Sequence, residues 1–352
     1  MRRHSRALAL SVALTIAFVW ILRRGALPLF PPAGVLPRAD GWMIALGALF
    51  LLVSMLSKYA RYHFLIAPIA ELSFARLMTI QAISTAVITL LPFRLGELAR
   101  PALLREKGKV SLMAVTGTVG AERIIDGVAF GLVLMGGLWL APPHEPLPSS
   151  IGNLPVPVAL VPRAAVAATS AFALALVLML LFVWRRELAK KITERVIGVV
   201  SAPIGARVAH SVSNLSDGLK FLPNLRFTGP YLLVTAFSIG CHALSILYGA
   251  VGVGLSTISL AQSTVLVGVL ALGFALPNAP GFFGAVQLAM YAGLGLYVAP
   301  EQVVREGAAL TFLFYMEYLG IITVLAVLAL IREYVAPRAP EQAALERPSA
   351  ES

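Results

Sequence analysis

Two acidic residues and a basic one stand close together inside the longest apolar segment of the sequence, residues 110–140. Glu122 and Asp126 are four residues apart, so their carboxylates share one face of a helix. Two neighbouring carboxylates in a medium of low dielectric constant require a cation, or one of them must keep its proton. Arg123 points about 100° away from Glu122 around a helix, and we expect it to face a different partner. The group predicts either an ion pair that holds helices together or the polar wall of a substrate path.

A second charged group, formed by Arg94, Glu97 and Arg100, follows the end of another apolar segment. Guanidinium groups are planar and carry several donors, which suits them to binding a phosphate. We therefore expect Arg94 and Arg100 to attract a phosphate group. Two alternatives remain open: these arginines neutralise Glu122 and Asp126, or they belong to an ordinary basic loop beside the membrane.

The third candidate is Glu317, which is flanked by Tyr315 and Tyr318 in the apolar segment 308–331. A charged side chain near the centre of a bilayer costs about 2.5–3.5 kcal/mol on insertion scales, and such residues are functional candidates for that reason. A lone glutamate there is usually paired or protonated. The sequence does not identify a partner for it.

No other arrangement of catalytic or metal-binding residues is found in the sequence. The five histidines are scattered without ligand spacing, and neither a Walker motif nor a G-x-S-x-G motif occurs. The single cysteine, Cys241, excludes an intramolecular disulfide. We predict no metal, no cofactor and no catalytic residue, and therefore a protein that is not an enzyme. An intramembrane transferase that uses Glu122 or Asp126 as a base is the least favoured alternative.

The composition indicates the environment in which these charged groups lie. Of the 352 residues, 59% are hydrophobic and 13% are charged, whereas a soluble domain carries about 25% charged residues. The formal net charge of +11 comes from basic residues that stand between apolar segments, which is the pattern of membrane topology. The sequence thus predicts an integral membrane protein in contact with the bilayer, and no nucleic-acid partner.

The apolar segments predict about six full membrane spans. A spanning helix needs about 20 residues. We expect Lys58 and Arg61 to end the second span at the membrane surface. The segments interpreted as spans are 7–22, 42–57, 110–140, 164–184, 231–248 and 308–331.

Three further apolar segments, 77–91, 264–276 and 285–298, are too short to span independently. Short, broken helices in a membrane are tolerated where they are buried in protein or line a wet cavity. We therefore predict an all-α polytopic membrane protein with two re-entrant helical hairpins, at 77–104 and 264–298.

The charges of the connecting segments predict the orientation, because basic residues are enriched on the cytoplasmic side. The connection 185–226 carries eight Lys and Arg residues against three acids, whereas 249–261 carries no charge. We therefore place the connection 185–226 in the cytoplasm and the connection 249–261 outside. This arrangement puts both termini in the cytoplasm. The two hairpins then enter the membrane from opposite faces.

A single transmembrane domain is predicted over residues 1–331. Its halves, 1–184 and 227–331, are joined by the cytoplasmic segment 185–226, whose apolar residues recur at helical spacing and predict amphipathic helices. Residues 332–352, rich in Pro, Ala and Glu, predict a disordered cytoplasmic tail.

The two predicted hairpins share a pattern at the break, in which Leu-Pro is followed after three residues by Gly. Proline removes a backbone donor and glycine permits a tight turn, so helices are expected to break there. Corresponding breaks in two halves are typical of inverted repeats in transporters. A chance match of so short a pattern is the alternative. The residues expected to form the breaks are Pro92, Gly96, Pro277, Pro280, Gly281 and Gly284.

Three segments, Leu91–Arg100, Ala121–Asp126 and Leu276–Gly284, occur in an order and at a spacing that resemble the lysylphosphatidylglycerol synthase transmembrane family of flippase-like membrane proteins. The resemblance covers roughly residues 8–331 and implies a multi-pass protein of the bacterial inner membrane. Such proteins are related to the flippase half of enzymes that make and flip aminoacylated phosphatidylglycerol. About twenty residues follow Ile331, too few for the aminoacyl-transferase domain, so synthase activity is not expected.

The resemblance implies a translocase for a lipid with an anionic head group. Arg94 and Arg100 would attract its phosphate, and Glu97, Glu122, Arg123 and Asp126 would form the polar wall of its path. The other expected contact residues are Asn278, Gln287 and Glu317. Gln287 stands where the family commonly has a glutamate, and its neutral amide argues against a lysyl lipid. The alternative function is an accessory subunit that binds a lipid- or glycan-modifying enzyme through residues 185–226.

Overall fold

The chain folds into helices, as its composition predicts. The computed structural model describes residues 13, 15–91, 96–97, 99–108, 110–143, 145–148, 150–151, 153, 160–185, 217–275 and 279–335, and of 105–108 the backbone alone. Within these residues the elements are helices, apart from an isolated bridge residue at Ile151. The α-helices are α2 (Gly41–Ala60), α3 (Tyr62–Ile66), α4 (Phe74–Leu90), α5 (Ala99–Gly108), α6 (Leu112–Leu140), α7 (Leu160–Trp184), α10 (Leu225–Gly252), α11 (Leu260–Ala275), α12 (Ala285–Leu294), α13 (Pro300–Val303) and α14 (Glu306–Val335). Two short 3-10 helices, η1 (Leu36–Arg38) and η3 (Pro280–Phe282), connect them.

Five helical segments of the described chain are long and apolar enough to cross a membrane, and the protein is a polytopic helical membrane protein. They are Gly41–Ile66, Leu112–Leu140, Leu160–Trp184, Leu225–Gly252 and Pro300–Val335. These five match five of the predicted spans. Of the remaining one, 7–22, residue 13 and residues 15–22 are helical, and the others lie outside the described residues.

The second predicted span, 42–57, was given too early an end. Helix continues through Lys58 to Ala60, and after Arg61 the short helix α3 follows to Ile66. The apolar run in the sequence ends at the first charged residue, but the helix continues because its backbone hydrogen bonds continue. The charged side chains are tolerated there because Arg61 is paired and Lys58 lies beside a cavity.

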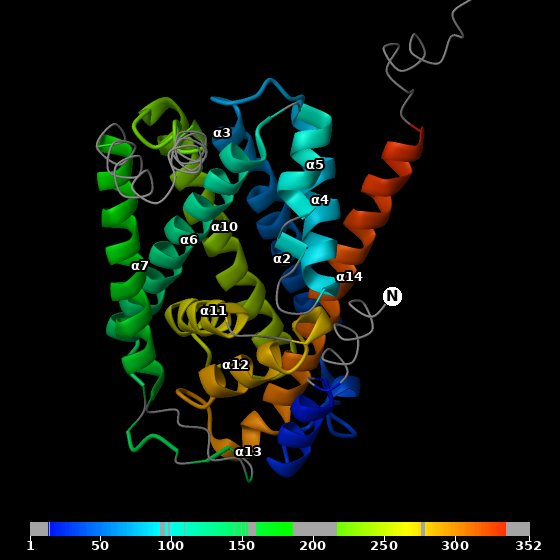
Figure 1. The fold of residues 1–352 in the computed structure, drawn as a ribbon. Helices are drawn as coiled ribbons and strands as arrows, with labels where there is room; N and C mark the ends of the chain where they lie inside the picture. Colours follow the sequence, from blue (N-terminus) through cyan, green and yellow to red (C-terminus); the bar gives the residue numbers. More distant parts are fainter. Residues whose placement is uncertain are drawn as a thin grey trace, which may run out of the picture.

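The short helices form two hairpins that enter the bundle from opposite ends (Figure 1). We call these ends the α3 end and the α13 end. Helices α4 and α5 run inward from the α3 end and back, whereas α11, η3 and α12 belong to the α13 end. Helix α4 contacts η3, so the two hairpins meet inside the bundle. The opposed arrangement agrees with the prediction, while the proposed inverted repeat remains a prediction.

The break of the second hairpin depends on backbone conformations that glycine adopts easily. Gly281 and Gly284 have φ angles of +74° and +83°, in the left-handed region. Pro280 starts η3, as its fixed φ angle permits. The side-chain oxygen of Gln287 accepts a hydrogen bond of 2.7 Å from the Gly284 N–H and so caps α12. Pro277 lies outside the described residues.

The break of the first hairpin is a close approach of its two arms. A Cβ atom added to Gly96 would collide with the backbone of Val87 and Ile88 in α4. Only glycine allows this contact between backbones. Pro92 and Arg94 lie outside the described residues.

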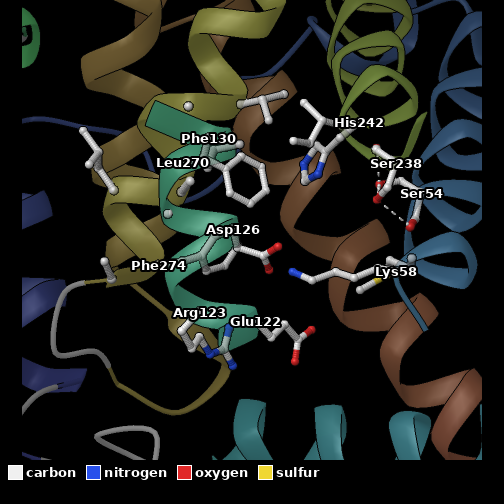
Figure 2. Close-up of a pocket in the computed structure, with 18 of the residues that line it drawn as sticks. Ser54, Lys58, Glu122, Arg123, Asp126, Phe130, Ser238, His242, Leu270 and Phe274 are labelled. Carbon is white, nitrogen blue, oxygen red and sulfur yellow. Dashed lines mark hydrogen bonds between the residues drawn. The ribbon is translucent and has the colours of Figure 1, made fainter. Parts of the chain in front are cut away.

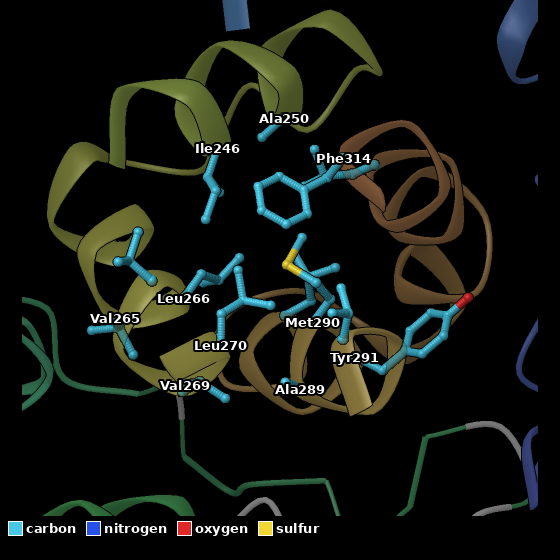
Figure 3. Close-up of a cluster of buried hydrophobic side chains, with 14 of the residues drawn as sticks. Ile246, Ala250, Val265, Leu266, Val269, Leu270, Ala289, Met290, Tyr291 and Phe314 are labelled. Carbon is cyan, nitrogen blue, oxygen red and sulfur yellow. The ribbon is translucent and has the colours of Figure 1, made fainter. Parts of the chain in front are cut away.

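The largest apolar core joins the second hairpin to α10 and α14 (Figure 3). Ile246 of α10, Leu266 and Leu270 of α11, Met290 of α12 and Phe314 of α14 are buried there. Apolar packing therefore holds the second hairpin against the spans.

Two tyrosine hydroxyls add hydrogen bonds to this packing. Tyr291 donates to the carbonyl oxygen of Pro28 at 2.6 Å, and Tyr297 donates to that of Ala141, at the end of α6, at 2.8 Å.

Helices α2 and α10 pack through small and hydroxyl residues. Ser54 donates a hydrogen bond of 2.8 Å to the carbonyl oxygen of Ser238, and Ser238 returns one of 3.0 Å to the carbonyl oxygen of Ser54. At Gly47, an added Cβ atom would lie 3.0 Å from the carbonyl oxygen of Ser245. Such close approaches of small residues are the usual basis of helix association in membranes.

Two predicted cytoplasmic segments are described only in part. Of the connection 185–226, residues 186–216 lie outside the described residues, so its amphipathic helices remain a prediction.

The predicted tail starts later than expected, because α14 continues to Val335. Arg332 donates a 2.6 Å hydrogen bond to the carbonyl oxygen of Ala75, which anchors this last turn of the helix to α4.

The close α2–α10 contact can be tested by filling it. Gly47→Leu should lower the free energy of unfolding by about 1–3 kcal/mol, the usual cost of overpacking a tight contact. Gly240→Leu on exposed α10 surface, where an added Cβ meets no atom within 4 Å, is the control. Thermal unfolding in detergent should show a lower midpoint for the first variant alone. Equal midpoints for both variants would contradict the close packing.

Candidate functional site

A cavity of about 210 Å³ lies among the spans and the two hairpins. Its walls come from α2, α4, α5, α6, α7, α10, α11, η3 and α14. One wall carries charged residues of α2, α5 and α6, and another is apolar, with Phe130, Leu270 and Phe274 (Figure 2). The cavity thus brings a charged surface and an apolar surface together inside the membrane-spanning bundle.

The two carboxylates of α6 are bound by a cation from the junction of α2 and α3. Arg61 forms two parallel hydrogen bonds of 2.6 Å to the two oxygens of Asp126 and a third of 3.1 Å to Glu122. It also donates a 2.8 Å hydrogen bond to the hydroxyl of Thr235 in α10. A guanidinium group provides such a bidentate arrangement, which a lysine ammonium group does not.

Arg61 is enclosed by the protein. Its side chain is 2% exposed, and its guanidinium lies over the ring of Tyr231 at 5.0 Å. Taking a charge out of water costs several kcal/mol unless it is paired and hydrogen-bonded. The contacts to Asp126, Glu122 and Thr235 supply this compensation, so the cluster holds α2, α3, α6 and α10 in one arrangement.

Glu122 has a second cation, Arg100 of α5. The two side chains form a buried ion pair, and the Arg100 guanidinium lies 4.9 Å from the ring centroid of Tyr62. Of the interpretations left open for Arg100, neutralisation of a carboxylate is the one that the contacts support. Arg94 lies outside the described residues, so its interaction with a phosphate remains a prediction.

Arg123 faces away from Glu122, as the helical geometry predicts. It forms an ion pair of 3.1 Å with Glu97, which lies just before α5. Both side chains are partly exposed, at 29% and 28%. Together with the Arg100–Glu122 pair, this contact attaches the inner end of the first hairpin to α6.

Polar groups of α10 complete the wall beside α2. Ser238 and His242 are one helical turn apart and line the cavity with Ser54 of α2 (Figure 2). The His242 ring stacks on Phe314 with centroids 5.6 Å apart, and its Nε2 atom is buried without a hydrogen-bond partner. His242 therefore packs against Phe314 and also contributes to the cavity wall.

Three of the predicted contact residues that the structure describes, Glu97, Gln287 and Glu317, do not line the cavity. Gln287 caps α12 with its side chain. Glu317 is half-buried on α14, and no hydrogen bond or ion pair joins it to a described residue. Asn278 lies outside the described residues. The structure thus brings Arg100, Glu122, Arg123 and Asp126 together at the cavity, with Glu97 paired behind them.

The prediction missed Lys58 and Arg61 as parts of the site. Both were assigned to the membrane surface because they follow an apolar run. Two signals pointed to them: the carboxylates at 122 and 126 needed a cation, and Lys58 and Arg61 are three residues apart and share one helix face. Sequence spacing alone does not determine which cation meets which carboxylate.

Removing Arg61 tests the ion cluster. Arg61→Met should lower the free energy of unfolding by about 3–5 kcal/mol, because it leaves Asp126 buried without a counter-charge. The double variant Arg61→Met/Asp126→Asn should recover part of this loss, which thermal unfolding of the purified protein measures. Arg185→Met, at an exposed helix end, is the control and should change stability little. A single variant as stable as the control would contradict a structural role of the cluster.

Comparison with known proteins agrees with this architecture. The family described as "Lysylphosphatidylglycerol synthase TM region" matches residues 7–326, which include four of the described spans, both hairpins and most of the last span, Pro300–Val335. No match was found among curated proteins or solved structures. Because the match extends over most of the 352 residues, the chain belongs to the family of the lysylphosphatidylglycerol synthase transmembrane region.

Proposed function

We propose that the protein is a translocase that moves a phosphate-containing lipid, or a lipid-linked precursor, across the inner membrane of a bacterium. The observation that carries this proposal is the cavity itself, in which a charged wall faces an apolar wall inside the spanning bundle. A lipid has the same division between a polar head group and apolar chains. Membership of a family named after a lipid synthase supports a lipid-related role.

The position of the two helix breaks also supports transport. Interrupted helices at membrane depth are tolerated where they line a cavity, and corresponding pairs of them mark the binding sites of many transporters. Here both hairpins contribute to the cavity, through Arg100 of the first and Phe282 of the second. Since α4 contacts η3, the two hairpins also meet each other within the bundle.

In this proposal the acidic and basic residues of α6 form the polar wall along which the head group moves. Glu122 and Asp126 are neutralised by Arg61 and Arg100, so they present hydrogen-bond acceptors without a net negative field. Arg123, paired with Glu97, is more exposed and lies along the same helix. An anionic head group therefore meets no uncompensated carboxylate in this part of the wall.

The orientation follows from the basic residues. Helix α7 ends and α10 begins at the α3 end, and the connection between them, 185–226, carries eight Lys and Arg residues against three acids. We therefore orient the α3 end toward the cytoplasm. The carboxyl end of α14 lies at the same end, and the α13 end faces the periplasm.

Filling the cavity should stop lipid movement. Ala271 of α11 lines the cavity, and Ala271→Phe would occupy much of the space available to a head group. Purified protein is reconstituted in vesicles with a fluorescent phospholipid, and a membrane-impermeant quencher measures how much label reaches the outer leaflet. Wild-type vesicles should lose nearly all fluorescence, and Ala271→Phe vesicles should resemble vesicles without protein.

The matched control is Ala171→Phe, which adds the same side chain to an exposed position of α7 outside the cavity lining. It should move lipid at the wild-type rate. If folded wild-type protein leaves the leaflet distribution unchanged, the translocase proposal fails, and the alternative of an accessory subunit is favoured. If Ala271→Phe moves lipid as fast as the control, the cavity is not the path.

The proposed orientation can be tested by cysteine labelling. In a Cys241→Ser background, which removes the single and buried cysteine, one cysteine is introduced at Glu71 or at Glu301. Both positions are exposed, at the α3 end and the α13 end respectively. An impermeant maleimide should label Glu301→Cys in intact spheroplasts and Glu71→Cys only after lysis. The reverse pattern would invert the topology.

A further inference from the structure

The cations at the cavity are not equivalent. Arg61 is bound to Asp126 and Glu122, Arg100 to Glu122, and Arg123 to Glu97. Lys58 is the exception, because it makes no hydrogen bond or salt bridge to any residue that the structure describes. Three cations are thus engaged with three carboxylates, and one positive charge is left over.

The charged end of Lys58 lies inside the cavity. It lies within the span Gly41–Ile66 and lines the cavity, yet its side chain is exposed. Figure 2 shows the side chain extended from α2 across the cavity, toward the side of Asp126 and below His242. The exposure is therefore to the interior of the cavity and not to an outer surface of the bundle.

The surrounding charges favour an anion as the partner of Lys58. Among the described residues, Lys58, Arg61, Arg100 and Arg123 contribute four positive charges, and Glu97, Glu122 and Asp126 contribute three negative ones, which leaves a net charge of +1. Asp126 lies on the same side of the cavity, but the hydrogen bonds that its carboxylate accepts from described side chains both come from Arg61, and no hydrogen bond or salt bridge joins it to Lys58.

We propose that Lys58 is the residue that binds the phosphate group of the transported lipid. This inference rests on the proposed function and gives that function its recognition group. A lysine ammonium binds phosphate as a point charge with three donors. Each of the three arginines would have to give up an ion-paired carboxylate to bind the same anion, whereas Lys58 has no hydrogen-bonded or ion-paired partner among the described residues to lose.

A second polar group lies on the same side of the cavity. The Nε2 atom of His242 is buried without a hydrogen-bond partner, and when it carries the ring proton it donates to a phosphate oxygen. The hydroxyls of Ser54 and Ser238 are already engaged with each other's carbonyl oxygens. The apolar residues Leu270 and Phe274 face this group from α11 and suit the glycerol and chain end of a lipid rather than a free ion.

The test measures binding and transport separately. Fluorescent phosphatidylglycerol is titrated into purified protein, and the same lipid is used in the vesicle assay. Lys58→Met, which keeps the length of the side chain without its charge, should weaken binding at least about tenfold, the loss expected for one charge-assisted hydrogen bond. Lys58→Arg should retain most of the affinity. The control is Lys220→Met, a surface lysine paired with Asp217 outside the cavity, which should bind as the wild type does.

The outcomes separate this inference from the translocase proposal. If Lys58→Met is folded and binds phosphatidylglycerol as tightly as the wild type, Lys58 is not the phosphate-binding residue, even when lipid transport is intact. If the wild type binds the lipid through Lys58 without moving it, the inference stands and the translocase proposal fails.

Competition with inorganic phosphate identifies the source of the anion. Inorganic phosphate should displace phosphatidylglycerol only weakly, because it lacks the apolar part that contacts α11. The contrary result is that inorganic phosphate binds as tightly as phosphatidylglycerol does and that the Lys58→Met variant loses this binding. That result would show that the cavity recognises a soluble phosphate, and it would overturn a lipid as the ligand.

Discussion

The structure depends on the compensation of two carboxylates that lie one helical turn apart inside a membrane-spanning helix. Neither Glu122 nor Asp126 can remain charged there without a cation, and the cations come from elements far away in the sequence. Arg61 connects the junction of α2 and α3 to α6, and Arg100 connects α5 to α6. Because a buried charge without its partner is costly, these pairs determine how the first hairpin and three spans are positioned around the cavity.

The second constraint is that the two hairpins are too short to cross a membrane. Their ends must meet inside the bundle, and the backbone there needs conformations and close contacts that glycine provides, as at Gly96 and Gly281. A pair of full spans in the same place would pack along their whole length. Two hairpins that meet end to end leave space beside their tips, and the cavity occupies the region where α4, α5, α11 and η3 approach the spans.

The sequence predicts the helical fold, the hairpins and part of the site, and its failures share one physical cause. The spacing of Glu122 and Asp126 predicted the need for a cation, and the direction of Arg123 was correct because both follow from local helix geometry. Lys58 and Arg61 were missed because hydropathy does not distinguish a charge at the membrane surface from one that is buried and paired. Gln287 was expected at the substrate path, but its amide caps α12. Pairings between distant elements are decided by tertiary packing, which no local pattern contains.

The two hairpins differ in what holds them, and this difference bears on how the cavity could open alternately to its two sides. The first hairpin is attached to α6 by the Arg100–Glu122 and Arg123–Glu97 pairs, and α4 is also bound to α14 through Arg332. Moving it would separate charges at membrane depth. Residues of α11 and η3 that line the cavity are apolar or glycine, and apolar surfaces can slide without separating charges. In the proposed translocase, movement of the second hairpin would therefore separate fewer charges than movement of the first, which would keep its ion pairs with α6.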